Sequence, residues 1–463
     1  MAGMCILYPN DSFAQNMPVK SVNSDTSRVM SLYDCMEYAV SNSTKMRIMQ
    51  AETNDARIDR RNAILNAFSP SVSGSSYAYY NFGRSIDPET NTYKSTTSFQ
   101  NGYSVGGNIS IFNGFEAVNN IKITKTAESM GISREQQSRD EICLAVMEAY
   151  YNVLYYKAMS DAFKIQTESA RESVRKAGIE ERLGRKGYAD FVQMEADLAD
   201  YEYNFINMQN MYNDALLTLQ DLMFWPLEQP LNIDFSLSSD SAIARELAAV
   251  YGTLQCYDSD KIIENALTSL PQVAIAKGEA ENAKRELNTA KWRLLPSLLL
   301  QGGWSTSYFT YPGEHGYKAT PFWNQFSNNG GEYIQLSLSI PIFNRLSRQS
   351  DISKKKNAYI KATAGYDRTV REIETEAKRA LQDRQGAVSA FVQACKKAQA
   401  QQEAYKYNTR KFEQGLISPI EYNTASGNYM NANAERLNAL FKYYLKRSVV
   451  EYYNGVSYLE QYR

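Results

Sequence analysis

Two stretches of the sequence, Phe115 to Leu183 and Leu346 to Gln414, each carry a helical pattern over about 69 residues. At a rise of 1.5 Å per residue, each would form a helix roughly 100 Å long. Helices in ordinary globular domains are far shorter, with a mean of about 11 or 12 residues. The chain must therefore build an elongated helical body, for which a coiled-coil rod is the simplest interpretation.

The residues along the helical seams favour an open layer of helices over a closed coiled coil. One heptad seam runs from Phe191 to Leu222, a second from Ile142 to Phe163, and a third, with a strict interval of seven, from Ile352 to Ala394. Ala and Tyr occupy many of these positions and Leu few, whereas a dimeric zipper prefers Leu and Ile. We therefore expect a shallow, extended layer of helices.

Four segments with a period of two are inconsistent with a simple rod. They are predicted to be strands at about 69–83, 102–114, 295–311 and 332–344. A tilted membrane-spanning strand needs about 9 to 11 residues, whereas soluble strands are usually about 5 or 6 residues long. The connecting segments, 84–101 and 312–331, are long and rich in Pro, Asn, Thr, Ser and Gly. Long loops of this kind are typical of the outer face of a bacterial outer-membrane barrel.

The two faces of the clearest strands differ in polarity. One face is apolar, and we predict that it contacts lipid through Tyr103, Val105, Ile109, Ile111, Ile334, Leu336, Leu338 and Ile340. The other face is polar but uncharged, which suits a water-filled lumen. The predicted lumen residues are Ser104, Asn108, Ser110, Gln335, Ser337 and Ser339.

Several short sequences recur in the same order, which indicates an internal duplication. Pro70-Ser71 recurs as Pro296-Ser297, and Phe112-Asn113 recurs as Phe343-Asn344 at an offset of 231 residues. Each half is expected to run helix, strand, strand, long helix, turn, long helix. We assign the first repeat to residues 31–222, an equatorial linker region to 223–259, the second repeat to 260–455 and a C-terminal tail to 456–463.

The N-terminal tail, residues 1–30, is open to more than one interpretation. Residues 4–8 and 12–15 resemble the end of a secretory signal, although the apolar core is short and no basic residue precedes it. The tail is either a truncated signal or a loose segment. Lipidation of Cys5 is a further alternative, which Met4 fits poorly because such a site needs a small residue at that position.

Composition excludes several classes of function. Lys and Arg number 50 against 51 Asp and Glu, so the chain lacks the basic excess of a nucleic-acid-binding protein. His315 is the single histidine, and the five cysteines lie far apart, so neither a metal site nor a redox motif is expected. We find no catalytic constellation and predict no cofactor and no enzymatic activity. The 34 tyrosines suit half-wet surfaces such as membrane interfaces and pore walls.

Four membrane strands cannot close a barrel within one chain, because even small barrels need about eight. Open strand edges in lipid would leave backbone groups unpaired, at a cost of several kcal/mol each. Several copies must therefore share one barrel. Two copies would give about eight strands around a filled interior, whereas three would give about twelve around an aqueous pore. A conduit therefore favours a homotrimer.

The ordered, duplicated set of motifs resembles the TolC-type outer-membrane efflux proteins, specifically their Bacteroidetes-type members. The resemblance covers about residues 31–456 and is carried by the strand openings Pro70-Ser71 and Pro296-Ser297, the strand exits Ile111-Phe112-Asn113-Gly114 and Ile340-Pro341-Ile342-Phe343-Asn344, the glycine turns Arg182-Leu183-Gly184 and Glu413-Gln414-Gly415, and the outer loop that begins Asn81-Phe82-Gly83-Arg84. Arg345 departs from the pattern, because a glycine usually follows Phe-Asn.

The resemblance implies the fold, the location and the partners. The fold would be an α+β membrane fold in which a trimer forms a 12-stranded β-barrel in the cell outer membrane, joined to a periplasmic α-helical barrel. Such proteins are passive exit ducts of tripartite efflux or type I secretion systems. Their partners are a periplasmic adaptor (a membrane fusion protein), an inner-membrane pump and outer-membrane lipid.

The resemblance also implies functional residues at the helix-hairpin tips, about 182–187 and 413–418. Acidic residues just past the tips gate the pore in this family, and the matching positions are Asp190 and Glu421. Acids in the first turn of a helix are also favoured simply by the helix dipole. The tips themselves would contact the adaptor through Arg182, Leu183, Gly184, Gly187, Gln414, Gly415, Leu416 and Ser418.

A periplasmic coiled-coil scaffold is the alternative function. The sequence can distinguish it from a duct by the strands, since a scaffold does not need strands with an uncharged polar face.

Overall fold

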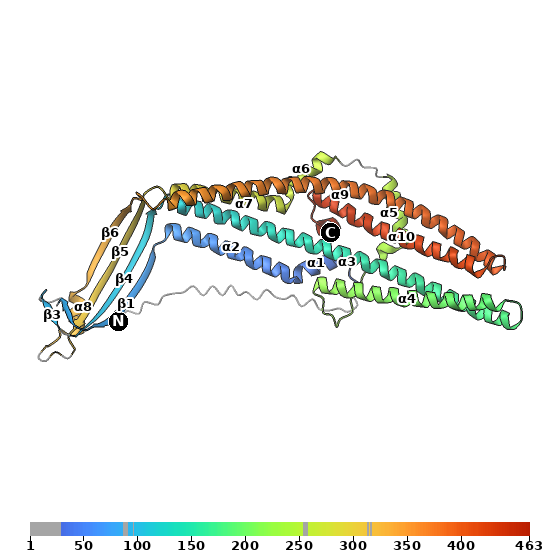
Figure 1. Cartoon of the computed structure of the whole chain (residues 1–463), viewed down its shortest axis with the longest axis horizontal. Coiled ribbons are helices and arrows are strands. Elements are labelled where there is room, and N and C mark those ends of the chain that lie inside the picture. The colour runs from blue at the N-terminus through green and yellow to red at the C-terminus, as the bar shows by residue number, and fades with distance from the viewer. Residues whose placement is uncertain (1–28, 87–90, 96, 253–257, 313, 315–316) are drawn as a thin grey trace.

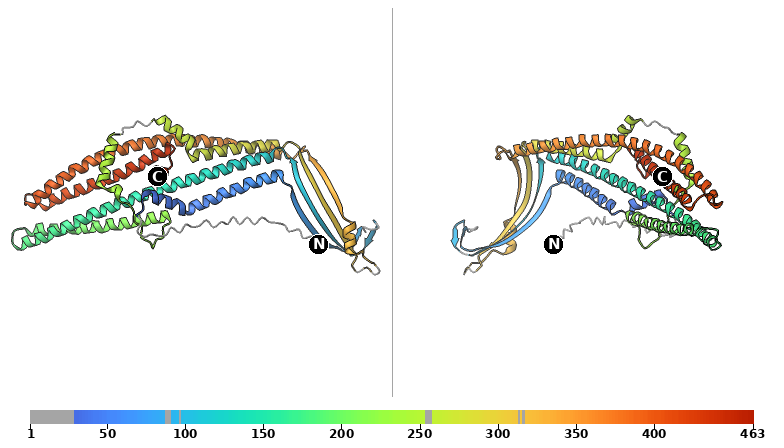
Figure 2. Two further views of the ribbon diagram at one scale, coloured as in Figure 1. Left: turned by 180° about the vertical axis from the view of Figure 1, so that it is seen from behind. Right: turned by 45° about the vertical axis from the view of Figure 1, so that its right-hand side comes forward.

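The computed structural model describes residues 29–86, 91–95, 97–252, 258–312, 314 and 317–463. The molecule is elongated, with a curved sheet at one end and two helical hairpin tips at the other (Figures 1 and 2). The predictions made for residues 1–28, including Cys5, and for Cys256 and His315 lie outside the described residues.

The two halves of the chain contain the same order of elements, so the predicted duplication is confirmed. The first half has α1 (Leu32–Asn42), α2 (Thr44–Phe68), β1 (Ser71–Asn81), β4 (Ser98–Phe112), α3 (Glu116–Arg182) and α4 (Tyr188–Met223). The second half has α6 (Ser259–Ser269), α7 (Pro271–Trp292), β5 (Ser297–Thr310), β6 (Gly331–Ser339), α9 (Ser347–Glu413) and α10 (Pro419–Tyr453). Helices α3 and α9 are each 67 residues long, as the sequence predicts.

Six shorter elements lie outside this repeated order. They are β2 (Arg84–Ile86), β3 (Tyr93–Ser95) and α8 (Phe322–Asn328) in the outer loops, η1 (Ser236–Ser238) and α5 (Asp240–Gly252) between the halves, and η2 (Glu460–Tyr462) near the C-terminus. The expectation that the 84–101 and 312–331 segments are loops alone was therefore wrong.

The four long strands form one antiparallel sheet in the order β1-β4-β5-β6. Residues directly opposite each other in an antiparallel pair project to the same face. Val105 lies opposite Trp304, and Ile109 lies opposite Leu300, which in turn lies opposite Leu336. The register therefore brings Tyr103, Val105, Ile109, Ile334, Leu336 and Leu338 to one face, and Ser104, Asn108, Ser110, Gln335, Ser337 and Ser339 to the other.

Two residues of the predicted apolar face are not regular strand positions. Ile111 lies within a register shift between Ser110 and Phe112. Ile340 lies beyond the end of β6, which stops at Ser339 although the sequence predicts a strand through residue 344. Pro341 explains the early end, because proline has no N–H to donate to the ladder.

Helix α8 takes the place of β6 along the outer end of β5. The Gln325 side chain accepts a hydrogen bond from the backbone N–H of Phe309 at 3.0 Å and donates one to its carbonyl at 2.9 Å. The Thr306 hydroxyl donates to the carbonyl of Phe326 at 2.7 Å. The two Gln325 bonds satisfy the backbone of Phe309, which lies beyond the part of β5 that pairs with β6 and where an unpaired edge in lipid would be costly.

The main hydrophobic core lies at mid-length, where α1, α3, α4, α9 and α10 meet the equatorial region. Its largest members are aromatic, and the Tyr150 hydroxyl donates to the carbonyl of Asp234 at 2.7 Å. Tyr458 is only 4% exposed, so the predicted C-terminal tail is a packed part of the core. Cys35, Cys143 and Cys395 are free and buried, as expected of packed thiols.

Asp140 is a buried acid in α3, and it gives a prediction about stability and pH. Its side chain is 4% exposed, and Gln136 donates to its two carboxylate oxygens at 3.1 and 3.2 Å. Burial raises the pKa of Asp140 from 3.8 to about 6, opposed by the Gln136 hydrogen bonds and by Arg139. Because the folded state holds this proton more tightly than the unfolded state, the contribution of Asp140 to stability falls as the pH rises from about 4 to about 6.

Asp140→Asn is therefore expected to stabilise the protein at pH 7.5, by on the order of 3 kcal/mol for a shift of about two pKa units. The apparent melting temperature of purified protein should rise at pH 7.5 and differ little at pH 4. Asp161→Asn, at an exposed position on the same helix, is the matched control. An equal effect of Asp140→Asn at both pH values would contradict the prediction.

Candidate functional site

The tip of the first hairpin joins α3 to α4 through a glycine turn. The N–H of Gly184 donates to the carbonyl of Glu181 at 2.8 Å, and the N–H of Arg185 donates to that of Glu180 at 2.8 Å. This pair of bonds is a Schellman motif. It needs a left-handed residue after the helix, and Gly184 has a φ of +69°.

The tip of the second hairpin repeats this geometry. Gly415 donates to the carbonyl of Phe412 at 2.9 Å, Leu416 donates to that of Lys411 at 2.9 Å, and the φ of Gly415 is +72°. Leu183 and Leu416 are 61% and 67% exposed. Each turn thus presents an apolar side chain to solvent, one residue before the glycine in the first hairpin and one residue after it in the second.

The predicted gate residues occupy the same position in the two repeats, the third residue of the helix after the tip. Glu421 forms a capping box with Ser418, in which the Ser418 N–H donates to Glu421 and the Glu421 N–H donates to the Ser418 hydroxyl, both at 3.2 Å. Asp190 is exposed in the first turn of α4. Within the described part of the chain, no hydrogen bond joins Asp190 to Glu421. Helix capping is therefore one demonstrated role for Glu421.

Between the main hydrophobic core and the tips, three contacts join the first hairpin (α3 and α4) to the second (α9 and α10). The side-chain amide of Asn423 in α10 donates a hydrogen bond to the Asp197 carboxylate in α4. The Tyr201 hydroxyl, one turn along α4, donates to the Asn423 side-chain oxygen at 3.4 Å. The Lys186 ammonium lies 5.4 Å from the centre of the Phe412 ring. We call Asp197, Tyr201 and Asn423 the hairpin link.

The hairpin link lies beside a stack of aromatic rings on the second hairpin. Tyr422 stacks on Phe412 with ring centres 4.6 Å apart, and the Tyr405 and Tyr422 hydroxyls are 3.1 Å apart. Burial raises the pKa of Tyr422 above its usual value, and it also raises the pKa of Asp197. Both tyrosines therefore contribute to packing within the second hairpin.

The hairpin link is not predicted by the sequence. Asp197 and Tyr201 are four residues apart, so they share a helix face. This spacing is the part of the link that can be recognised in the sequence. Nothing in the sequence relates that face to Asn423, because the pairing depends on how the two hairpins approach each other.

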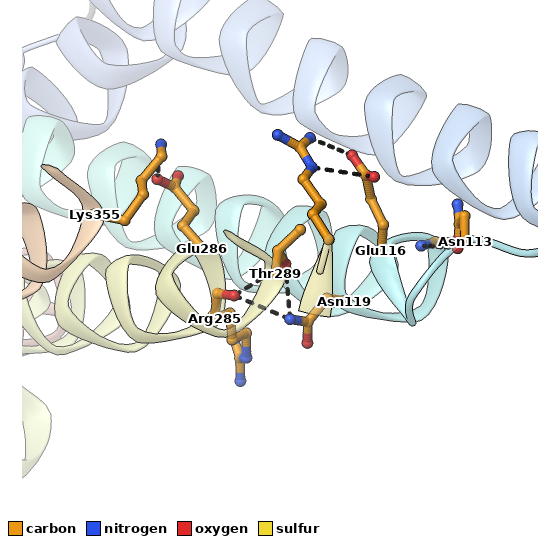
Figure 3. A network of polar contacts seen from close by, with 9 residues as sticks. Asn113, Glu116, Asn119, Arg285, Glu286, Thr289 and Lys355 are labelled. Carbon is orange, nitrogen blue, oxygen red and sulfur yellow. Dashed lines mark hydrogen bonds and ion pairs between the residues drawn. The ribbon is translucent and has the colours of Figure 1, made fainter. Parts of the chain in front are cut away.

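A polar network lies where the helices meet the sheet (Figure 3). Arg293 forms a bidentate ion pair with Glu116, and Lys355 pairs with Glu286 at 2.8 Å. Asn119 donates to the Arg285 carbonyl at 3.0 Å and to the Thr289 hydroxyl at 2.9 Å. These contacts join α3 to α7 and α7 to α9, and they border a cavity of about 420 Å³. The network fixes the helices directly beneath the strands.

The two faces of the sheet differ in their side-chain contacts. The Ser75 and Ser104 hydroxyls are 2.8 Å apart on the polar face. On the apolar face, Tyr103 packs against Phe322 and Phe326 of α8, so this predicted lipid contact is partly covered by the chain itself. Aromatic residues gathered at one end of the strands are typical of the interfacial girdle of outer-membrane barrels.

In the part of the chain that the structure describes, no cluster of three or more His, Cys, Asp or Glu side chains has the arrangement of a metal site. Among the same residues, each helix is too short or too polar to serve as a transmembrane span.

Comparison with known proteins places this geometry in a family. The outer membrane efflux protein family matches residues 37–223 and 262–448, one segment in each half. A search of curated proteins found no match.

Several solved structures share the fold at low sequence identity. The Campylobacter jejuni CmeC outer membrane channel is 16% identical with a TM-score of 0.73, over 92% of this chain and 85% of that one. Vibrio cholerae VceC is 14% identical with a TM-score of 0.72, over 92% and 96% of the two chains. The open state of the Neisseria gonorrhoeae MtrE outer membrane channel is 14% identical with a TM-score of 0.70, over 92% and 89%.

These findings confirm the resemblance to the TolC-type outer-membrane efflux proteins and the predicted fold class. They also confirm the predicted location in the outer membrane and the absence of enzymatic activity, because the family consists of non-catalytic outer-membrane ducts. The chain therefore belongs to the outer membrane efflux protein family.

Proposed function

We propose that this chain forms, as a homotrimer, the passive exit duct of a tripartite efflux or type I secretion system. The observation that carries the proposal is the four-stranded sheet, which has an apolar face, an uncharged polar face and two edge strands, β1 and β6. Membership of the efflux family supports a duct and makes the periplasmic scaffold the weaker interpretation.

The edges of the sheet support a trimer. Strands β1 and β6 each pair on one side only within the described residues. Hydrogen-bonding groups left open in lipid would cost several kcal/mol each, so β6 of one copy must pair with β1 of the next. Three copies give about twelve strands, a barrel wide enough to hold water. The polar face would then line the lumen, and the apolar face would contact lipid.

The energy for export would come from a partner. We infer that an inner-membrane pump supplies it and that a periplasmic adaptor docks at the two glycine turns. The exposed Leu183 and Leu416 support this role, because an apolar side chain presented to water at the end of a hairpin is a natural contact for another protein. A wide, uncharged lumen contacts its cargo weakly, so the pump would select the cargo.

The gate assignment remains a prediction. In a trimer, Asp190 and Glu421 would each form a ring of three carboxylates near the tip, and such rings attract cations. The capping box of Glu421 supports a second role in helix stability.

One preparation tests the duct and its docking site. Purified protein in detergent is expected to run as a heat-sensitive trimer and to conduct ions across planar bilayers. Replacing both Leu183 and Leu416 with Asp should leave the trimer and the conductance intact and abolish pump-dependent export in cells. Monomers without conductance would rule out the duct. Normal export by the double variant would rule out adaptor contact through these side chains.

A further inference from the structure

Arg345 has a strained backbone conformation at a place where the first repeat has glycine. The equivalent residue, 231 positions earlier, is Gly114, with a φ of +67°, and Arg345 has a φ of +58°. The residues that follow, Phe115 and Leu346, also match, with φ values of +62° and +60°. A left-handed conformation costs free energy for residues other than glycine. Because the first repeat makes the same turn with glycine, the turn itself does not require the arginine side chain.

The chain around Arg345 is unusually apolar on its exposed side. Ile340, Ile342, Phe343 and Leu346 are 60%, 94%, 77% and 58% exposed. In the sequence, Ile340 and Ile342 continue the apolar alternation of Leu336 and Leu338 past the end of β6 at Ser339. The segment directly after α7, which packs against α9, adds the exposed side chains of Leu294 and Leu295. We call these six residues the junction rim.

A basic stretch begins at the junction rim and continues into α9. Residues 345–356 contain the cations Arg345, Arg348, Lys354, Lys355 and Lys356 and one acid, Asp351. The equivalent residues of the first repeat, 114–125, contain Glu116, Lys122 and Lys125. The second repeat is therefore far more basic at the same place, so this charge is not a property of the shared fold.

Two of these cations already have protein partners. Lys355 pairs with Glu286, and the Arg348 guanidinium donates to the carbonyl of Arg293. Arg345, Lys354 and Lys356 are exposed, and none of them forms an ion pair within the described residues. Helix dipoles disfavour cations near a helix start, so helix stability does not account for this charge either.

We propose that the junction rim and the basic stretch together bind anionic phospholipid of the periplasmic leaflet of the outer membrane. The rim side chains lie at the level of the acyl chains, and Arg345 lies beside the phosphate groups at the point where the strands leave the membrane. Lys354 and Lys356 lie about 14 and 17 Å further along α9, which exceeds the Debye length of about 10 Å, so they attract the same surface more weakly than Arg345 does. This inference rests on the proposed function, because it needs the strands to span the membrane.

The exposed apolar side chains indicate that the junction rim faces lipid and not the lumen. Ile342 and Phe343 are among the most exposed apolar residues of the described chain, and a water-filled lumen would leave them in water. Lipid removes them from water and also brings phosphate to Arg345, so one occupant satisfies both features.

The test compares anionic with neutral lipid on purified trimers. The thermal stability of the trimer in neutral detergent is measured as dioleoylphosphatidylglycerol or dioleoylphosphatidylcholine is added. The wild type is expected to be stabilised more by phosphatidylglycerol. Arg345→Gly should melt higher than the wild type without lipid, since the strain is relieved, and should bind phosphatidylglycerol roughly fivefold more weakly. Arg345→Lys keeps the charge and should keep the preference, and Arg185→Gln at the distant tip should behave as the wild type.

Combining Arg345→Gly with Lys354→Gln and Lys356→Gln should remove the preference altogether. Equal stabilisation of the wild type by the two lipids would overturn the inference. So would an unchanged preference in the triple variant, and a change in ion selectivity with unchanged lipid preference would assign Arg345 to the lumen instead. Conductance of the variants in neutral bilayers should persist, which separates failure of this inference from failure of the proposed duct.

Discussion

Leu336→Arg is expected to prevent assembly of the barrel. Leu336 is 61% exposed, near the middle of β6, on the face that carries Ile109 and Leu300. An arginine facing lipid near the bilayer midplane costs about 2 to 4 kcal/mol. A trimer would carry three copies, so the assembled barrel would lose about 6 to 12 kcal/mol, which is as large as the whole stability of a typical domain.

The neighbouring residue provides the matched control. Gln335 lies opposite Gln301 on the polar face, so Gln335→Arg would place the same charge in the water-filled lumen at nearly the same depth. The measurement is the amount of heat-sensitive trimer in outer-membrane fractions. Leu336→Arg should leave almost none, and Gln335→Arg should leave the wild-type amount with altered ion selectivity. Equal loss of trimer in the two variants would show that the faces are assigned wrongly.

The contrast between these two residues could be predicted from sequence because a strand alternates with a period of two. The apolar and polar sets of Gly102 to Phe112 and of Glu332 to Phe343 are predicted to lie on opposite faces, and the observed register agrees with this as far as Ser110 and Ser339. The long helices could be predicted for a similar reason. Their apolar spacing continues, apart from minor breaks, up to the glycine turns at Gly184 and Gly415.

Features that depend on single contacts between distant segments could not be predicted. Gln325 replaces a strand partner for Phe309, and a lone glutamine in a Gly- and Asn-rich loop gives no sign of this. The apolar alternation, which continues through Ile342, predicts a later end of β6 than the observed one at Ser339, because Pro341 has no N–H to donate to the ladder. Here the hydrophobic pattern predicts a longer strand than backbone hydrogen bonding allows, and the strand ends where the hydrogen bonds end.

The hairpin link leads to the second prediction with a large effect. Asp197 and Asn423 lie on different hairpins, so a movement that spreads the tips must break their hydrogen bond. A hydrogen bond to a charged group contributes about 1.5 to 3 kcal/mol, and we expect the lower value here because Asp197 is partly exposed. Loss of about 1.5 kcal/mol shifts the balance between closed and open tips by roughly tenfold for each protomer.

Asn423→Ala and Asp197→Ala are therefore each expected to raise the resting conductance of single trimers in planar bilayers by about tenfold or more. The double variant should add little to either single variant, because the two side chains share one bond. Asp190→Ala and Glu421→Ala serve as the comparison. If the carboxylate rings close the tip, those variants also raise conductance, and if Glu421 only caps α10, Glu421→Ala lowers stability by about 1 kcal/mol instead.

The same bond predicts a dependence on pH. Burial raises the pKa of Asp197, so its carboxylate takes up a proton at a higher pH than an exposed aspartate does. The amide of Asn423 donates more weakly to a protonated carboxyl group than to a carboxylate. Lowering the pH through this raised pKa should therefore increase the resting conductance of the wild type, and Asp197→Asn should remove that increase. A pH response that survives in Asp197→Asn would assign the titration to another group, and wild-type conductance in Asn423→Ala would show that the link does not hold the tips together.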